Sequence, residues 1–172
     1  MQNDQLAARH FTTSAIHIVE QLWPRSADRG ITTEITEETS LMLALLSLLR
    51  WERKVGLVAL QRLGIDRNAL ADDVDRTLDA ACAEVRTRKG PPTLQSLPSG
   101  RPGFIVDLQT PLAPLLEAAE HEALGMGHSW VGSEHILLAI VRLADPHLRE
   151  VLDRHGIKYD DVRRVVLELL HS

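Results

Sequence analysis

The stretch LDRHGIKYDDVRRVVLELL, residues 152–170, is a diverged repeat of a segment found earlier in the chain. Its counterpart is LQRLGIDRNALADDVDRTL, residues 60–78, and aligning the two superposes Gly156 on Gly64 and the apolar positions around them. Each segment has the pattern of a helix, a glycine stop and a second helix, because glycine commonly follows the last helical residue. The sequence therefore predicts a fold built from two copies of one helical unit.

The rest of each unit follows when the alignment is continued towards the N-terminus. TSLMLAL (39–45) lines up with EHILLAI (134–140), provided that the first copy carries three additional residues after this helix. The first copy also has a longer connection over 24–34, where the second has the compact GMGHSW at 125–130. Because one unit alone is too small to bury its apolar faces well, we expect the two to pack about a pseudo-twofold axis.

Hydrophobic periodicity predicts an all-α protein, an eight-helix globule made of two four-helix repeats. Apolar residues recur at three- and four-residue spacing along the chain, and the two-residue alternation typical of strands is absent. The expected helices cover about 13–23, 37–49, 52–63, 67–85, 111–124, 134–143, 146–155 and 159–170.

One segment interrupts this pattern. TRKGPPTLQSLPSGRPGF, residues 87–104, is dense in proline, glycine and serine, and such a composition does not continue a helix. We therefore place the first, degenerate repeat in residues 1–86, a linker in 87–109 and the second repeat in 110–172.

Helix start signals support the predicted boundaries in the second repeat. Thr110 before Pro111, and Asp145 before Pro146, each place a capping side chain ahead of a proline at the first helical position. Ser133 is the expected cap of the helix that carries EHILLAI.

Composition and charge exclude several classes of partner. A formal net charge of -5 and an aromatic content of 3% leave neither a basic surface nor a base-stacking platform, so we expect no nucleic acid partner. The longest apolar stretches fall well short of the about 20 residues of a membrane span, and the N-terminal residues show no leader pattern. With the single Cys82 excluding an internal disulfide, we expect a cytoplasmic protein with no membrane contact.

Residues 110–143, TPLAPLLEAAEHEALGMGHSWVGSEHILLAIVRL, followed by VLDRHGI at 151–157, resemble the Clp N-terminal repeat. This paired module stands at the front of the ClpA, ClpB and ClpC unfoldases. The shared features are the Thr-Pro helix start, the Ala-rich helix, the Gly-His turn, the V-G-[ST]-E-H signature and the glycine stop. The resemblance implies the fold already expected from the repeat.

The first repeat resembles the family more weakly. It matches at HFTTSA (10–15), LALL (43–46) and LGID (63–66), but it shows TEETS (36–40) in place of the V-G-[ST]-E-H signature. The chain also contains no G-x-x-x-x-G-K-[ST] phosphate loop, so the resemblance implies a free-standing N-domain of the ClpC type without an ATPase.

The resemblance implies a binding function and not an enzyme. The expected partners are the Clp unfoldase/protease machinery, its adaptors or its protein clients, and the chain would act as an adaptor, a regulator or a decoy. A second hypothesis is a structural or dimerisation scaffold, although we expect a monomer. A third, a small hydrolase acting through Glu134 and His135, lacks a nucleophile, a metal set and a partnered second carboxylate.

The resemblance also implies a ligand site. In ClpC-type N-domains the Thr that opens each repeat and the Glu of the signature form a pocket for phosphoarginine, and these roles fall here on Thr110 and Glu134. A helix N-terminus suits the phosphoryl oxygens and a carboxylate suits the guanidinium. In the first repeat the Thr is Thr12, but Thr39 occupies the Glu position and Glu38 would point about 100° around the helix. We therefore expect at most one working pocket.

Residue chemistry alone is also compatible with purely structural roles for these residues. Glu134 and His135 can form a solvated first turn above a buried apolar run, and Phe11 can be an ordinary staple residue before a helix cap. The resemblance instead implies that Phe11 contributes to a hydrophobic patch that receives cyclic peptide ligands. Gln109 stands at the counterpart of Phe11, so half of that patch is absent.

We expect no metal and no cofactor. HEALGMGH, residues 121–128, begins like a zinc-protease motif, but its second histidine falls three positions too late. His121, His128 and His135 recur every seven residues, yet the GMG turn is expected to separate them. Cys82 is predicted to be a small core residue, and the tryptophans near helix ends are predicted to seal the core.

Overall fold

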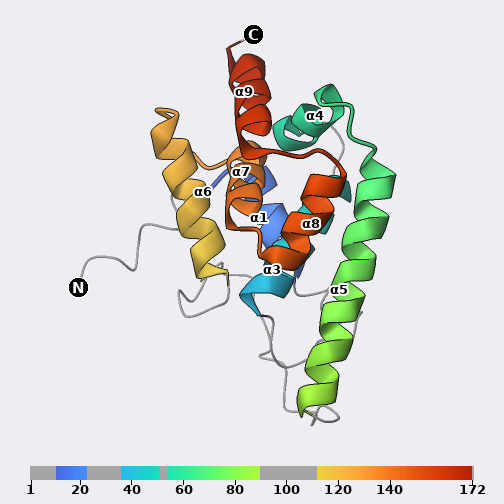
Figure 1. Ribbon diagram of the computed structural model, residues 1–172. Helices are drawn as coiled ribbons and strands as arrows, with labels where there is room; N and C mark the ends of the chain where they lie inside the picture. The colour runs from blue at the N-terminus through green and yellow to red at the C-terminus, as the bar shows by residue number, and fades with distance from the viewer. Residues whose placement is uncertain (1–10, 23–35, 51–53, 90–111, 172) are drawn as a thin grey trace, which may run out of the picture.

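The computed structural model describes residues 11–22, 36–50, 54–89 and 112–171, and these residues form an all-α fold without strands. The helices in order, labelled as in Figure 1, are α1 (Thr13–Glu20), α3 (Glu37–Arg50), α4 (Val55–Arg62), α5 (Arg67–Lys89), α6 (Ala113–Gly125), α7 (Ser133–Leu143), α8 (Pro146–Arg154) and α9 (Tyr159–Leu170). The predicted fold class is confirmed, and each predicted helix has a counterpart among these eight.

Two helices form the centre of the core. In α7 every residue from Ser133 to Val141 is buried, and in α3 every residue from Thr39 to Leu49 is buried. A helix that is apolar on all sides can be stable only when other helices surround it. Helix α7 accordingly contacts α1, α3, α4, α6 and α9, and Figure 1 shows it between α6 and α5.

The contacts between the halves follow the expected pseudo-twofold relation. Helix α4 of the first repeat packs on α9 of the second, and the equivalent pair, α8 and α5, also packs together. The two central helices, α3 and α7, contact each other directly. Each repeat thus covers apolar surface of the other, which is how two units that are too small alone share one core.

The glycine stops occupy the conformation that the repeat alignment requires. Gly64 has a φ of 74° and Gly156 a φ of 70°. The residues that follow them, Ile65 and Ile157, donate their N–H groups to carbonyl oxygens five residues earlier, at 3.1 and 2.8 Å. Since an added Cβ at either glycine would meet nothing within 4 Å, the positive φ and not crowding favours glycine at both turns.

Several boundaries differ from the sequence prediction. Helix α5 continues to Lys89, so the segment predicted to begin the linker at 87 is still helical for three residues. Helix α6 begins at Ala113 after Leu112, whereas the predicted cap Thr110 lies outside the described residues. The 24–34 insertion, Trp23 and Trp51 also lie outside them. The predicted cap Asp145 is confirmed, since its carboxylate accepts hydrogen bonds from His147 N and Leu148 N.

The structure also tests the predicted burial of individual side chains and the prediction that no helix spans a membrane. Cys82 is buried, as predicted for a small core residue. Trp130 does not seal the core, because 45% of its surface is exposed. Among the described helices, none combines the length and the apolar composition that crossing a membrane requires.

Candidate functional site

The signature segment forms the start of α7, and its cap differs from the prediction. Gly132 is the N-cap, and Ser133 is the first helical residue. The backbone N–H of Gly132 donates to Nδ1 of His135 at 2.9 Å, so the side chain three positions after the cap returns to the cap residue. This is one half of a capping box; the other half is absent because glycine has no side chain.

Ser133 connects the two repeats instead of capping the helix. Its hydroxyl oxygen accepts a hydrogen bond from the backbone N–H of Gly56 in α4 at 3.3 Å and donates to Oε2 of Glu134 at 3.3 Å. A Cβ on Gly56 would lie 2.9 Å from the carbonyl oxygen of Ser133. The close approach of α4 to the start of α7 therefore requires a glycine at position 56.

Glu134 is not the solvated residue that its charge suggests, since only 4% of its surface is exposed. Its carboxylate folds back over Gly132, where an added Cβ would lie 2.3 Å from Oε1. Glycine at the cap thus leaves the space that this carboxylate fills, at a helix end whose partial positive charge favours an anion. From the described residues the carboxylate accepts one hydrogen bond, the long one from Ser133.

His135 is fully buried and is held neutral. Burial is the main reason that its pKa falls to about 4, with the nearby His128 as a further cause. Because Nδ1 accepts the N–H of Gly132, the proton of the neutral ring is on Nε2. Nε2 lies 2.8 Å from Nδ1 of His128 and can donate to it.

The turn before α7 brings two of the three spaced histidines together, contrary to the expectation that it would separate them. Gly127 has a φ of 76°, and the N–H of His128 returns to the carbonyl of Ala123 at 2.9 Å. The ring of His128 then stacks on Trp130, with centroids 4.8 Å apart and planes 8° from parallel. The buried cap of α7 is therefore linked through His128 to an exposed indole, while His121 lies exposed on α6.

The opening of the first repeat lies against the signature of the second. Phe11 forms an isolated parallel bridge with Val131, and the N–H of Thr12 donates to the carbonyl of Val131 at 2.9 Å. Thr12 is the N-cap of α1, with its hydroxyl accepting from Ala15 N at 3.3 Å. Phe11 is partly buried and packs on the core. The structure thus joins Phe11 and Thr12 to the segment that carries Glu134.

The first repeat has a capping box of its own, which changes the residue alignment by one position. Thr36 N donates to Thr39 Oγ1 at 2.9 Å, and Thr39 N donates to Thr36 Oγ1 at 3.2 Å. By this geometry Thr39 corresponds to His135, and Glu38 corresponds to Glu134, two positions after the cap. The predicted 100° misplacement of Glu38 is therefore wrong. The sequence did not reveal this correspondence, because matching the apolar residues of the two helices aligns Thr39, and not Glu38, with Glu134.

A buried carboxylate explains the motif that resembled a zinc protease. Glu122, which is 5% exposed, accepts hydrogen bonds from Arg142 at 3.1 Å and from the hydroxyl of Tyr159 at 2.7 Å. Burial, followed by this hydrogen bond, raises the pKa of Tyr159. The network joins α6, α7 and α9, so Glu122 is a structural residue of the second repeat.

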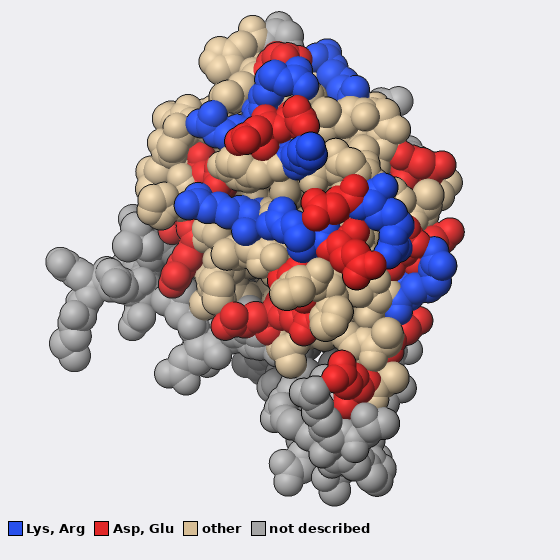
Figure 2. Space-filling model, in the orientation of Figure 1, with Lys and Arg blue, Asp and Glu red and all other residues tan. Residues whose placement is uncertain are grey.

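The surface shows charges of both signs. On the face drawn in Figure 2, the Lys and Arg side chains of the described residues are interspersed with Asp and Glu. This face offers no extended basic surface of the kind that binds nucleic acid.

Comparison with known proteins identifies the family of the C-terminal part of the chain. Residues 107–172 match the Clp repeat (R) N-terminal domain. They belong to the Clp repeat family. The wider chain is similar to the chaperone protein ClpB of Oceanobacillus iheyensis, with 30% identity over 129 residues, and to the negative regulator of genetic competence ClpC/MecB of Bacillus subtilis, with 28% identity over 128 residues. Each alignment covers 74% of this chain but 14% of the relative.

Solved structures extend the likeness in fold to the whole chain. The N-terminal domain of the chaperone ClpD from Arabidopsis thaliana aligns with a TM-score of 0.55 and 17% identity, covering 95% of this chain and 96% of that one. A structure from investigations of a malarial protein secretion system aligns with a TM-score of 0.64 and 13% identity, covering 94% and 95%. The fold is that of a Clp N-terminal domain, and the predicted resemblance is confirmed.

Proposed function

We propose that this chain binds proteins or peptides as a Clp N-terminal domain and serves the Clp unfoldase/protease machinery as an adaptor, regulator or decoy. The similarity to ClpB and ClpC supports a binding module of this type and not an enzyme. Because the chain spans 14% of the length of these relatives, the activity of the full-length relatives is not assigned to it.

The proposed ligand is a phosphorylated arginine side chain, recognised at the start of α7. The observation that carries this proposal is Glu134, a carboxylate that is 4% exposed and accepts one long hydrogen bond from the described residues. A guanidinium group would supply directed, charge-assisted donors that the described residues do not offer to this carboxylate. The helix N-terminus beside it would favour the phosphoryl oxygens.

The remaining predicted residues have defined places in this proposal. Thr110 would contact the phosphoryl group in the second repeat, as the resemblance implies, and Thr12 would approach it from the first-repeat side. Phe11 and the exposed Trp130 would provide apolar contacts next to the pocket, including contacts for cyclic peptide ligands. The carboxylate of Glu134 must turn away from Gly132 to reach a ligand, so we expect micromolar and not tighter affinity.

Isothermal titration with free phosphoarginine tests the proposal. The wild-type chain should bind with a stoichiometry near one, Glu134→Gln should abolish the heat, and Glu117→Gln should not change it. Glu117 is a suitable control because it is exposed on α6 of the same repeat. Thermal unfolding of each variant verifies that the fold is intact. Absence of binding by the wild type would remove phosphoarginine as the ligand but not the wider binding function.

A second candidate function, a dimerisation scaffold, is supported by exposed apolar side chains. Leu124, Trp130 and Leu143 are 67%, 45% and 36% exposed. Light scattering coupled to size exclusion separates the two functions. A monomer over the micromolar range contradicts the scaffold, whereas a dimer that Trp130→Ala dissociates would support it.

A further inference from the structure

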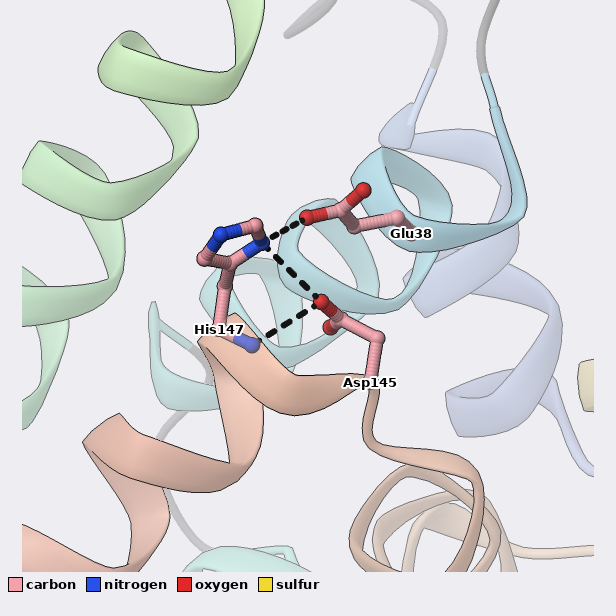
Figure 3. Close-up of side chains that lie close together, drawn as sticks. All are labelled: Glu38, Asp145 and His147. Carbon is pink, nitrogen blue, oxygen red and sulfur yellow. Dashed lines mark hydrogen bonds and ion pairs between the residues drawn. The ribbon is translucent and has the colours of Figure 1, made fainter.

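Three side chains that are distant in sequence converge where α3 and α8 begin (Figure 3). Nδ1 of His147 lies 2.7 Å from Oε1 of Glu38 and 3.4 Å from Oδ2 of Asp145. One ligand atom from each of the three residues lies within 4.8 Å of the other two. Glu38 belongs to the first repeat and is 109 positions from His147, so the cluster exists only because the repeats pack together.

The positions of these side chains are set by the helix starts. Asp145 is the N-cap of α8, where Oδ2 accepts from His147 N at 3.1 Å and Oδ1 accepts from Leu148 N at 3.3 Å. His147 follows in the first turn of α8, and Glu38 occupies the second position of α3. The side chains of Glu38, Asp145 and His147 are 34%, 20% and 63% exposed, so an ion can reach all three from solvent.

The charge of the cluster favours a cation. Nδ1 of His147 faces two carboxylates, since it lies 2.7 Å from Oε1 of Glu38 and 3.4 Å from Oδ2 of Asp145. Glu84 on α5 adds a third negative charge near the ring.

We propose that Glu38, Asp145 and His147 form a binding site for a divalent cation of the zinc type. Nδ1 of His147 and one oxygen of each carboxylate would be the ligands, and water would complete the coordination. Imidazole with carboxylate oxygens is a ligand set that Zn²⁺ accepts, whereas Mg²⁺ and Ca²⁺ require oxygen ligands throughout. The cation would replace the proton on Nδ1 and neutralise the two carboxylates.

The surroundings limit the expected affinity. The N-termini of α3 and α8 carry partial positive charge, which opposes a cation and leads us to expect micromolar binding. His147 also lines a cavity of about 300 Å³ between α5 and α8, together with the charged side chains of Asp73, Arg76, Glu150 and Arg154. These groups are paired with one another, so they leave little net charge. The bound ion would link the first repeat to the second.

Isothermal titration with zinc chloride at pH 7.5 tests this site. The chain contains eight histidines, so the variants decide the assignment. Wild type should bind one ion with micromolar affinity, and His147→Gln and Glu38→Gln should each weaken binding at least tenfold. His121→Gln, which changes an exposed histidine far from the cluster in sequence, should bind as wild type does.

Two further measurements make the result decisive. Because zinc binds only the neutral imidazole, zinc binding should weaken as the pH is lowered from 7.5 to 6. Asp145→Asn, which retains a capping side chain, should keep the melting temperature of the metal-free protein but lose the increase that zinc produces. Unchanged zinc affinity in His147→Gln, or no binding by wild type, would overturn the proposal.

Discussion

The N-termini of α3 and α7 share one hydrogen-bonding pattern at the cap, but their glutamate side chains lie in different environments. In both, the third helical residue accepts a hydrogen bond from the N-cap, through Thr39 in α3 and His135 in α7. In both, a glutamate stands one position earlier. Glu38 has a side chain that is 34% exposed and reaches His147 of the other repeat, whereas Glu134 is buried over its own helix end.

The two helix starts also differ in the residue at the cap. In α3 the cap residue has a side chain, since the hydroxyl of Thr36 bonds Thr39, and the carboxylate of Glu38 bonds His147 of the other repeat. In α7 Gly132 leaves the space over the helix end open, and the carboxylate of Glu134 occupies it. The two helix starts thus differ both in the cap residue and in the partner of the carboxylate, which joins the two repeats in α3 and remains within one repeat in α7.

The largest effect is expected from removing the buried histidine of α7. His135→Ala creates a cavity at a fully buried position and leaves the N–H of Gly132 without its acceptor, so we expect a loss of about 2–4 kcal/mol. The equivalent change in α3, Thr39→Ala, should cost about 1 kcal/mol. Urea unfolding measures both, and equal losses would contradict the distinction between the two helix starts.

The pH dependence of stability should come next in size. The folded-state pKa of His135 is about 4, below its usual value near 6.5, so the unfolded chain gains a proton first as the pH falls. The stabilisation that the neutral His135 contributes to the free energy of unfolding is therefore fully present above pH 6.5 and is lost as the pH falls towards 4. We expect a loss of about 2 kcal/mol between pH 7 and pH 5.

Glutamine at position 135 isolates this titration, since it can accept the cap N–H without gaining a proton. The unfolding free energy of His135→Gln should change less between pH 7 and pH 5 than that of the wild type, while His121→Gln should behave as the wild type. His147 acts with the opposite sign because its pKa is raised. A wild-type pH profile in His135→Gln would show that another group is responsible.

A smaller effect is expected from adding a methyl group to the cap of α7. Gly132→Ala places a Cβ where the Glu134 carboxylate lies and should cost about 1–2 kcal/mol. If that carboxylate is the cause, the same substitution in a Glu134→Ala background should be nearly neutral. A double-mutant cycle compares the stability cost of Gly132→Ala with and without the Glu134 carboxylate. Additive losses would show that the cost arises from the backbone of the cap and not from the carboxylate.

The smallest effect on metal-free stability is expected at the first-repeat carboxylate. Glu38→Gln weakens a pair whose histidine is largely exposed, so the melting temperature should change little and the change should vanish in 1 M salt. Glu122→Gln, which disturbs a buried network, is the matched comparison and should show a larger change that salt does not remove. A salt-insensitive loss in Glu38→Gln would contradict the assignment of Glu38 to the surface.

Local signals made much of the fold predictable. Glycine stops at Gly64 and Gly156, the cap at Asp145 and three- and four-residue apolar spacing depend on residues within one or two turns of each other. The cap of α7 was misassigned to Ser133 because a glycine cap has no side-chain signal, and its acceptor is a histidine instead of the usual glutamate or glutamine.

The sequence by itself determined that the protein is helical, that it contains two related units and that the second carries a Clp repeat. Only the tertiary structure decided the environment of the polar side chains. Burial of Glu134 depends on the empty space over Gly132, the His128–His135 contact depends on a turn, and the pairing of Glu38 with His147 depends on the packing of one repeat on the other. Periodicity records which face of a helix is apolar, but the solvation of a charge is set by the atoms that surround it in space.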